Sequence, residues 1–402
     1  MKAWLLLAGT VTALAAGVTA YHATRPVWTA AERARIVALS ISNLLALPPD
    51  PSNRVADSPE AAAFSEALFA DLRMSADGTT GCITCHDPAT GFVDELVHEV
   101  GEGISRRTMP IPGSAYSAWQ LWDGRADSQW AQALGPIENV LEHGSDRIAA
   151  IRLIATSYPD PYIELFDELP DLDRLPERGS PLADEAAREL WARLPEDDRT
   201  AVDAVFANLG KAIAAYMRSL PPPRSRFDHY ADAMAEGSPT KGLLSDEEIE
   251  GLRLFIGRAQ CATCHDGPRF TDDAFHNTGV PALEGLPPDL GRVDAVPRAQ
   301  SDPFNCLGPH SDAGAQDCLE LRFVRAGHDM VGAYRTPSLR AVATRAPFMH
   351  AGQIDTLEGV IAHYAEAPAS LAGHSELESL DLAPDETRVL AAFLRSLNPI
   401  EE

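Results

Sequence analysis

The chain has 402 residues, of which 59 are Asp or Glu and 33 are Lys or Arg, so its formal net charge is −26. This balance argues against a nucleic-acid-binding protein, because affinity for nucleic acid comes mostly from Lys and Arg side chains that replace counterions. With 45% hydrophobic residues the chain can form a real core, and its length predicts two or three domains at about 150 residues each.

Residues 3–20 form the only long apolar run, and Lys2 precedes it. A charged start, an apolar stretch and a small-residue exit at Val18-Thr19-Ala20 are typical of a secretory signal. We expect residues 1–20 to be a cleaved signal peptide, with an N-terminal membrane anchor as the alternative, because the run is just long enough to span a bilayer. In both cases the remaining chain would be exported, which predicts a periplasmic location.

Helices are predicted where apolar residues recur at a spacing of three or four. Thr29 with Glu32, and Ser245 with Glu248, fit capping boxes that begin a helix. In chain order, the expected helices lie near residue 30 and over 58–74, 147–157, 184–219, 245–256 and 384–397.

Four of the six cysteines occur in two identical frames. These are Cys82-Ile83-Thr84-Cys85-His86 and Cys261-Ala262-Thr263-Cys264-His265. The Cys-x-x-Cys-His pattern indicates covalent attachment of haem c, in which the thiols bond the vinyl groups and the histidine ligates iron. A Cys₄ zinc site is the main alternative, but 175 residues separate the two pairs and each carries the extra histidine. A thioredoxin-like dithiol would need a βαβ pattern, which the sequence lacks.

The other two cysteines, Cys306 and Cys318, lie twelve residues apart in a segment rich in Gly, Pro and Asp. In an exported protein such a pair is expected to form a disulfide that closes a loop. Free thiols are the weaker alternative.

The two haem frames indicate an internal duplication. Strand alternation is almost absent, and the stretches 158–186, 220–243 and 281–317 are rich in Pro, Gly and Asp, which predicts irregular connections. We therefore expect a mainly α protein with two cytochrome c-like haem domains, over 30–235 and 236–402, joined by long irregular connections.

The residues around both frames resemble the bacterial dihaem cytochrome c peroxidase and MauG family. The resemblance runs in the family's order from about residue 55 to 397. It rests on LWDGRA at 121–126, QALGPIEN at 132–139, CHDGPRFTD at 264–272, FHNTGV at 275–280, YRTPSLR at 334–340 and APFMHAG at 346–352.

The resemblance implies that His86 ligates a first, peroxide-reactive haem, with Gln132, Pro136 and Glu142 on its distal side. A positioned carboxylate can move a proton between the two peroxide oxygens, and an apolar haem face would raise its pKa. Taken alone, Glu142 and Gln132 would be interpreted as solvated helix-surface residues. Their spacing within the family's pattern favours the functional interpretation.

For the second haem the resemblance implies His265 as ligand, storage of an oxidising equivalent, and Trp122 as an electron relay between the haems. Trp122 alone would be interpreted as core packing. In classical peroxidases a methionine follows fourteen residues after the histidine matching His350, and Tyr364 has that place here. A phenolate favours higher oxidation states of iron than a thioether does. Tyr364 is the expected ligand, with Met349 as the alternative.

Three departures from the family's pattern bear on the site. His143 stands where a methionine is usual, so it could add a hydrogen-bond donor on the distal side of the first haem, or an iron ligand. His98 lies near the position of the histidine that caps a resting first haem, but the register places Glu99 there. An asparagine that helps to bind calcium between the domains corresponds to Arg107, which leaves Ca²⁺ between the domains open.

The preferred function is a peroxide-driven dihaem oxidoreductase. Tyr364 and the misplaced His98 favour the MauG and methanobactin-associated branch, in which hydrogen peroxide is used to oxidise a partner protein. The alternative is a peroxidase that detoxifies hydrogen peroxide with electrons from a small cytochrome c or cupredoxin. A dihaem electron carrier without chemistry is a further alternative, but it would leave Gln132, Glu142 and Trp122 without a role.

Overall fold

A computed structural model describes residues 28–400, apart from 102–103, 287 and 315. It is mainly helical, and its strands form only two short two-stranded sheets, so the mainly α class expected from the sequence is confirmed. The expected signal segment, residues 1–20, lies outside the described residues. Within the described part of the chain, no helix is both long enough and apolar enough to cross a membrane.

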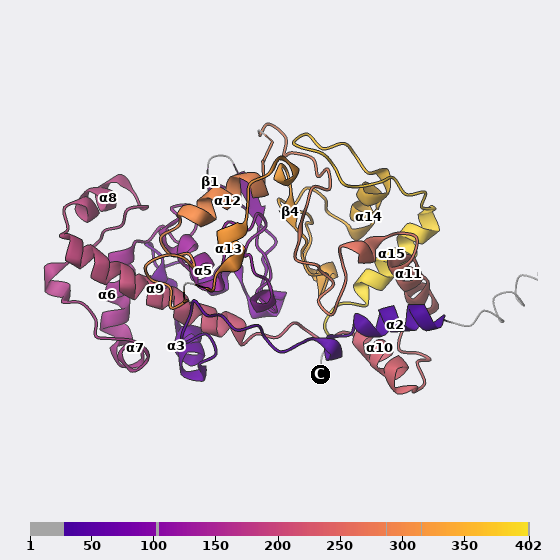
Figure 1. The fold of residues 1–402 in the computed structure, drawn as a ribbon, viewed down its shortest axis with the longest axis horizontal. Helices are drawn as coiled ribbons and strands as arrows, with labels where there is room; N and C mark the ends of the chain where they lie inside the picture. Colours follow the sequence, from indigo (N-terminus) through magenta and orange to yellow (C-terminus); the bar gives the residue numbers. More distant parts are fainter. Residues whose placement is uncertain (1–27, 102–103, 287, 315, 401–402) are drawn as a thin grey trace, which may run out of the picture.

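The helices and strands follow one another along the chain as labelled in Figure 1. The α-helices are α2 (Ala30–Ala38), α3 (Pro59–Phe69), α4 (Cys82–Cys85), α5 (Gln129–Glu138), α6 (Arg147–Ser157), α7 (Pro159–Leu165), α8 (Glu185–Ala192), α9 (Glu196–Arg218), α10 (Arg226–Glu236), α11 (Asp246–Ile256), α12 (Arg292–Ser301), α13 (Leu319–Phe323), α14 (Leu357–Glu366) and α15 (Pro384–Arg395). The strands are β1 (Val97–Gly101), β2 (Ile104–Arg107), β3 (Phe275–His276) and β4 (Tyr334–Arg335). One of the 3₁₀ turns, η6 (Cys261–Thr263), contains Cys261, and Cys264 follows it directly.

Both predicted capping boxes are present and begin helices. The Thr29 hydroxyl accepts from the Glu32 amide at 3.2 Å, and the Glu32 carboxylate accepts from the Thr29 amide at 2.7 Å, at the start of α2. Ser245 and Glu248 exchange the same two bonds at the start of α11. These bonds satisfy amides that the first helical turn leaves without partners.

All three stretches that we expected to be irregular contain helices, and α7 lies within 158–186. Helix α10 lies within 220–243, and α12 lies within 281–317 although Pro297 interrupts its hydrogen bonding. The start of α10 carries a capping box of Ser225 and Asp228 that the composition of the stretch concealed. The expectation was wrong there because Pro and Gly content describes a whole stretch, whereas a helix needs only a short favourable part of it.

The first of two large apolar cores is built around α9. This helix packs against α3, α5 and α6, and its buried face includes Phe206, Leu209 and Ile213. Gly210 allows the contact with α5, because a Cβ at that position would lie 2.6 Å from the Trp130 carbonyl oxygen. The core therefore places α5, which carries Gln132 and Pro136, against α9, the longest helix in the described part of the chain.

The second core joins α11 and α15 with α2, α10 and α14. It contains four mutually packed phenylalanines, Phe227, Phe255, Phe270 and Phe393. Trp28, Ile36 and Leu39 also belong to it, so the described part of the chain begins beside the second core and then crosses to α3 in the first (Figure 1). The expected domain division between 235 and 236 remains a prediction. Helix α2 belongs to the expected first domain by its sequence position, but it packs in the second core.

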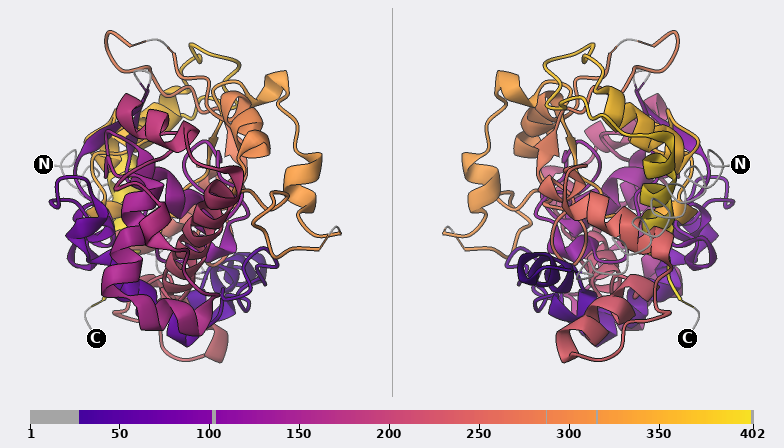
Figure 2. Two further views of the ribbon diagram at one scale, coloured as in Figure 1. Left: turned by 90° about the vertical axis from the view of Figure 1, so that its left-hand side faces the viewer. Right: turned by 90° about the vertical axis from the view of Figure 1, so that its right-hand side faces the viewer.

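The segment with α12 and α13 returns from the second half of the chain to the first core. Both helices lie along one side of the molecule in the end-on views of Figure 2. Phe304, which follows α12, packs edge-on against Phe206 of α9 with ring centroids 5.7 Å apart. The disulfide expected between Cys306 and Cys318 is present in this segment. The two halves are thus interleaved rather than simply adjacent.

A buried ion pair joins three distant segments of the second core. The guanidinium of Arg340 donates to both carboxylate oxygens of Asp228, at 2.6 and 2.9 Å, and also to the Leu39 carbonyl. Both charged side chains are almost completely buried. Burial alone would raise the pKa of Asp228, but the hydrogen bonds and charge of Arg340, with the Ile41 amide, hold that pKa below its ordinary value.

We predict that Asp228→Ala lowers the free energy of unfolding by about 3–5 kcal/mol, because it leaves the Arg340 charge buried and unpaired. Urea denaturation at neutral pH measures this. Arg388→Ala, which removes one partner of the exposed pair with Glu247, is the control and should cost less than about 1 kcal/mol. Equal costs for the two variants would contradict the prediction.

The same pair predicts a pH dependence. Since the folded-state pKa of Asp228 is lowered, its contribution is present above the unfolded-state pKa and is lost as the pH falls through the folded-state value. The wild type should therefore lose more stability than Asp228→Ala between neutral and acidic pH.

Candidate functional site

The two Cys-x-x-Cys-His frames fold into matching turns in the two halves of the protein. In the first, the His86 amide donates to the Cys82 carbonyl at 2.9 Å, and in the second the His265 amide donates to the Cys261 carbonyl at 2.9 Å. None of the four cysteines of the frames takes part in a disulfide. Each turn therefore presents two thiols and an imidazole together, as covalent haem attachment requires.

Both frame histidines are oriented by a carbonyl oxygen. His86 Nδ1 donates to the Phe92 carbonyl and His265 Nδ1 donates to the Phe270 carbonyl, each at 3.0 Å. Burial lowers the pKa of both imidazoles. A neutral imidazole with its proton on Nδ1 leaves the Nε2 lone pair for a metal, which is the arrangement expected of an iron ligand.

A large cavity adjoins the second turn. Its volume is about 250 Å³, and Cys261, Cys264 and His265 form part of its wall. Aliphatic and aromatic side chains supply most of the rest, among them Phe255, Leu339, Phe348, Leu357, Ile361, Leu390 and Leu394. We call this space the second cavity. Its apolar lining suits a macrocycle that is held by the two thiols at one edge.

The guanidinium of Arg345, which lines the second cavity, tests whether haem fits there. The Nε of Arg345 is buried and has no hydrogen-bond partner, while its Nη1 donates to the Ser338 carbonyl at 3.2 Å. Burial lowers the pKa of Arg345 to about 10. A buried cation without a counter-charge is costly, and a haem propionate would supply the missing carboxylate. The residues therefore fit the group that the frames imply.

Two of the residues predicted for the distal side of the first haem lie on α5, and the third follows this helix. Gln132 and Pro136 are on the helix, and Glu142 is on the loop that follows. This loop folds back because the His143 amide donates to the Pro136 carbonyl at 3.1 Å. The Glu142 carboxylate is half-buried and accepts from the Asn139 side-chain amide at 2.9 Å.

Glu142 also lies near the first haem turn. Burial raises the pKa of the Cys85 thiol to about 12, and the negative charges of Asp94 and Glu142 add to this rise. His143, the next residue, is buried with its Nδ1 unpartnered, and burial lowers its pKa, with His86 contributing in the same direction. The structure thus brings Glu142 and His143 to the first site, and their roles remain predictions.

His98 lies beside the first haem turn, and its role there remains a prediction. Its Nε2 is 2.5 Å from the Asp94 carboxylate, and both lie close to the Cys85 sulfur. The second turn repeats this cluster with Asp272 and His276 beside Cys264.

This repeated pair was not predicted from the sequence, although each Asp stands four residues before its His and follows a haem frame. The clusters are not separate metal sites if haem attachment converts their cysteines to thioethers, because only a thiolate is a good metal ligand.

Trp122 belongs to the first half of the chain but lines the second cavity. Its indole Nε1 donates to the Arg107 carbonyl at 2.8 Å, and its own carbonyl accepts from the Arg335 amide at 2.8 Å. The indole is therefore fixed at both its side chain and its backbone, against residues from both halves.

Arg107 is almost completely buried, and its guanidinium bonds carbonyl oxygens of both halves. It donates to Leu96 at 2.5 Å, to Pro347 at 3.1 Å and to Ala346 at 3.2 Å. A positive charge thus already occupies the place where the family's calcium-binding asparagine would stand. Calcium between the domains remains an open question.

Both candidate ligands for the second haem line the second cavity. Tyr364 comes from α14, and Met349 comes from the loop before it, in a left-handed backbone conformation with φ of 69°. Burial raises the pKa of Tyr364 to about 12. Tyr364 remains the predicted ligand and Met349 the alternative.

Residues 59–236 match the family model for di-haem cytochrome c peroxidase. The chain is 31% identical over 347 residues to the methylamine utilization protein MauG of Methylorubrum extorquens. The aligned region covers 84% of this chain and 78% of that protein. It is 28% identical to cytochrome c551 peroxidase of Pseudomonas aeruginosa, over 83% of this chain and 78% of that protein.

Solved structures share the fold. The diheme peroxidase BthA from Burkholderia thailandensis aligns with a TM-score of 0.60 and 21% identity, over 89% of this chain and 88% of that one. A MauG-like protein associated with microbial copper homeostasis aligns with a TM-score of 0.58 and 24% identity, over 89% and 95%.

Proposed function

Because this chain belongs to the dihaem cytochrome c peroxidase and MauG family, it is a haem peroxidase-type oxidoreductase with two haem groups, and we propose that it uses hydrogen peroxide to oxidise a partner protein. The observation that carries this proposal is that one cavity is lined by both a phenol, Tyr364, and an indole, Trp122, beside the second haem turn. An exported enzyme with a periplasmic partner would fit the signal-like residues 1–20.

Each frame would hold one haem through its two thioethers and its histidine. Cys82, Cys85 and His86 would hold the first, and Cys261, Cys264 and His265 the second. Bound in these turns, the haem groups supply the redox chemistry with hydrogen peroxide.

The first site would handle the protons of the reaction. Asn139 donates to one oxygen of the Glu142 carboxylate, so the other oxygen is available to take a proton from the near peroxide oxygen and return it to the far one. The Gln132 amide would orient the peroxide by hydrogen bonding, and Pro136 would keep water away from the same face.

Trp122 would carry electrons between the two haem sites. Its indole is held by the Arg107 carbonyl, which limits its motion and keeps its ring against the second cavity. Tyr364 would ligate the second iron as a phenolate, which favours the higher oxidation states that a stored oxidising equivalent needs.

The second candidate function is detoxification of hydrogen peroxide with electrons from a small cytochrome c or cupredoxin. Met349 in the second cavity favours it, since a thioether ligand favours reduced iron. The dihaem carrier fits less well, because it gives no role to Glu142 beside the first haem turn.

We predict that Glu142→Gln slows the reaction of the haem-loaded protein with hydrogen peroxide by about 10²–10⁴-fold, the usual worth of a positioned proton carrier. Stopped-flow absorbance measures the rate, and the spectra of both resting haems should be unchanged. Glu95→Gln, at an exposed carboxylate after the first haem turn, is the control. Peroxide kinetics that do not change in Glu142→Gln would show that Glu142 is a bystander.

Tyr364→Phe should change the absorption spectrum of the second haem, because it removes the proposed phenolate ligand, whereas Met349→Leu should leave that spectrum intact. Tyr364→Met should raise the reduction potential of the second haem, as measured by spectroelectrochemical titration. The opposite pattern, with Met349→Leu altering the spectrum and Tyr364→Phe not, would make peroxide detoxification the preferred function.

A further inference from the structure

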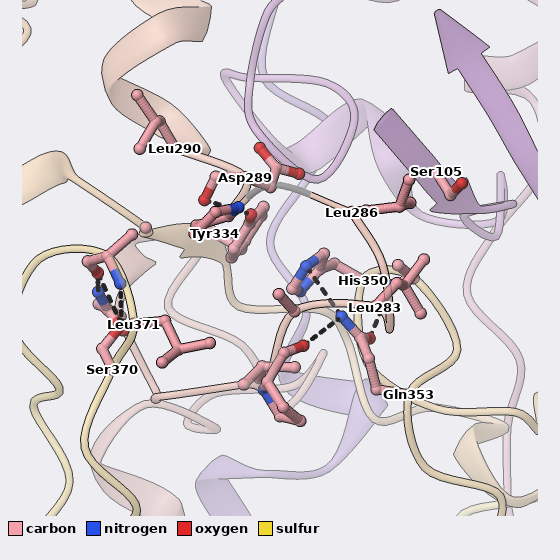
Figure 3. A pocket seen from close by; sticks show the side chains of 18 of the residues that line it. Ser105, Leu283, Leu286, Asp289, Leu290, Tyr334, His350, Gln353, Ser370 and Leu371 are labelled. Atoms are coloured by element: carbon pink, nitrogen blue, oxygen red, sulfur yellow. Dashed lines mark hydrogen bonds between the residues drawn. The ribbon is translucent and has the colours of Figure 1, made fainter. Parts of the chain in front are cut away.

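Another pocket, with a volume of about 210 Å³, lies at the protein surface next to the second cavity. Figure 3 shows it between the segment with Leu283, Leu286 and Leu290 and the segment with Ser370 and Leu371. Leu371 is 71% exposed and Leu286 is 38% exposed, so leucines stand at its mouth. We call it the leucine-rimmed pocket.

The floor of this pocket is also a wall of the second cavity. Tyr334 and His350 line both spaces. Their rings are stacked, with centroids 3.7 Å apart and an angle of 11° between the ring planes. Two aromatic rings in van der Waals contact thus separate the surface pocket from the place of the second haem.

Hydrogen bonds hold the stacked pair in position. The Gln353 side-chain amide lies 3.1 Å from His350 Nε2 and also donates to the Pro281 carbonyl at 3.2 Å. The Tyr334 hydroxyl donates to the Asp289 carbonyl at 3.3 Å. The dashed lines of Figure 3 mark such bonds around Gln353 and His350.

The lining of the pocket selects a class of ligand. Leucine side walls and an aromatic floor suit a single flat ring. The residues that line it include the carboxylates of Asp289 and Asp294 but no Lys or Arg. Asp289 is ion-paired with the buried Arg106, so Asp294 supplies the remaining negative charge, which disfavours an anionic ligand. The exposed Asp294 carboxylate at the rim can accept a hydrogen bond from a hydroxyl on such a ring.

We infer that the leucine-rimmed pocket binds the ring of a phenol, free or as a tyrosine side chain, and that Tyr334 and His350 pass its electron to the second haem site. The inference rests on the proposed peroxide-driven function and names the entry point for its electrons. Each ring loses one electron and its phenolic proton to become a phenoxyl radical. Two rings are oxidised for each hydrogen peroxide, which takes up two electrons and two protons and gives two waters.

Leu371→Trp tests the binding, because it places an indole at the mouth of the pocket without touching the second cavity. Binding of 4-fluorophenol to the resting haem-loaded protein, followed by ¹⁹F NMR without peroxide, should be saturable in the wild type and weaker in the variant by at least about 10-fold. Leu182→Trp, at a leucine 67% exposed on the other half, is the matched control and should bind like the wild type. Equal binding by all three proteins would overturn the inference.

Tyr334→Phe tests the relay. It keeps the stacked ring and should bind 4-fluorophenol like the wild type, but its ring is much harder to oxidise. With hydrogen peroxide, kcat for phenol oxidation should fall by at least about 10-fold, and an unchanged kcat would overturn the relay. If no variant reacts with peroxide at all, the proposed function fails, while the NMR titration still decides whether the pocket binds phenols.

The source of the ring is distinguished by a blocked pentapeptide with one central tyrosine. Competition with 4-fluorophenol would show that the pocket accepts the ring on a polypeptide, as a protein partner would present it. Binding of the free phenol alone would identify a small phenol as the donor.

Discussion

Arg107 connects the two haem sites through its backbone as well as its side chain. Its amide donates to the His350 carbonyl at 2.8 Å, and its carbonyl accepts the Trp122 indole at 2.8 Å. A buried guanidinium must have its N–H groups bonded, and here the carbonyls of Leu96, Ala346 and Pro347 meet that requirement. The loop after the first haem turn and the wall of the second cavity are therefore fixed to one residue.

This constraint determines what the two sites can do together. Electron transfer depends on fixed distances between redox groups, and Arg107 fixes both Trp122 and the loop that carries Met349 and His350. The stacked ring of Tyr334 is adjacent to the same loop, so the proposed entry of electrons and the proposed relay share one support. The proton chemistry that we propose for Glu142 would take place elsewhere, on the loop that folds back over α5.

Local patterns predicted the parts of the structure that depend on nearby residues. The capping boxes at Thr29 and Ser245 begin helices as expected, and both haem frames form the turn that their spacing implies. The family's motifs assigned Tyr364, or alternatively Met349, to the second haem, and both residues line the second cavity. The motifs could not indicate how these residues are held.

The remaining features depend on contacts between residues far apart in the sequence. Asp228 and Arg340 are 112 positions apart, and neither periodicity nor composition relates them. The stacking of the Tyr334 ring on the His350 ring depends on how the loop between these two residues folds, which the sequence patterns do not indicate. Helix α12 was not predicted, because Pro297 and the glycines near it are typical of irregular segments. Phe304, which follows this helix, packs on α9 and so holds the segment against the first core.

The central claim is that Trp122 joins two separately held haem sites into one reacting unit. Rapid mixing of the haem-loaded protein with hydrogen peroxide, followed at wavelengths that distinguish the two haems, tests it most directly when the wild type is compared with Trp122→Phe. The account predicts that the first haem responds at the wild-type rate in the variant, whereas the response of the second haem is slowed by at least about 10-fold. A second-haem response in Trp122→Phe that keeps pace with the wild type would contradict the claim.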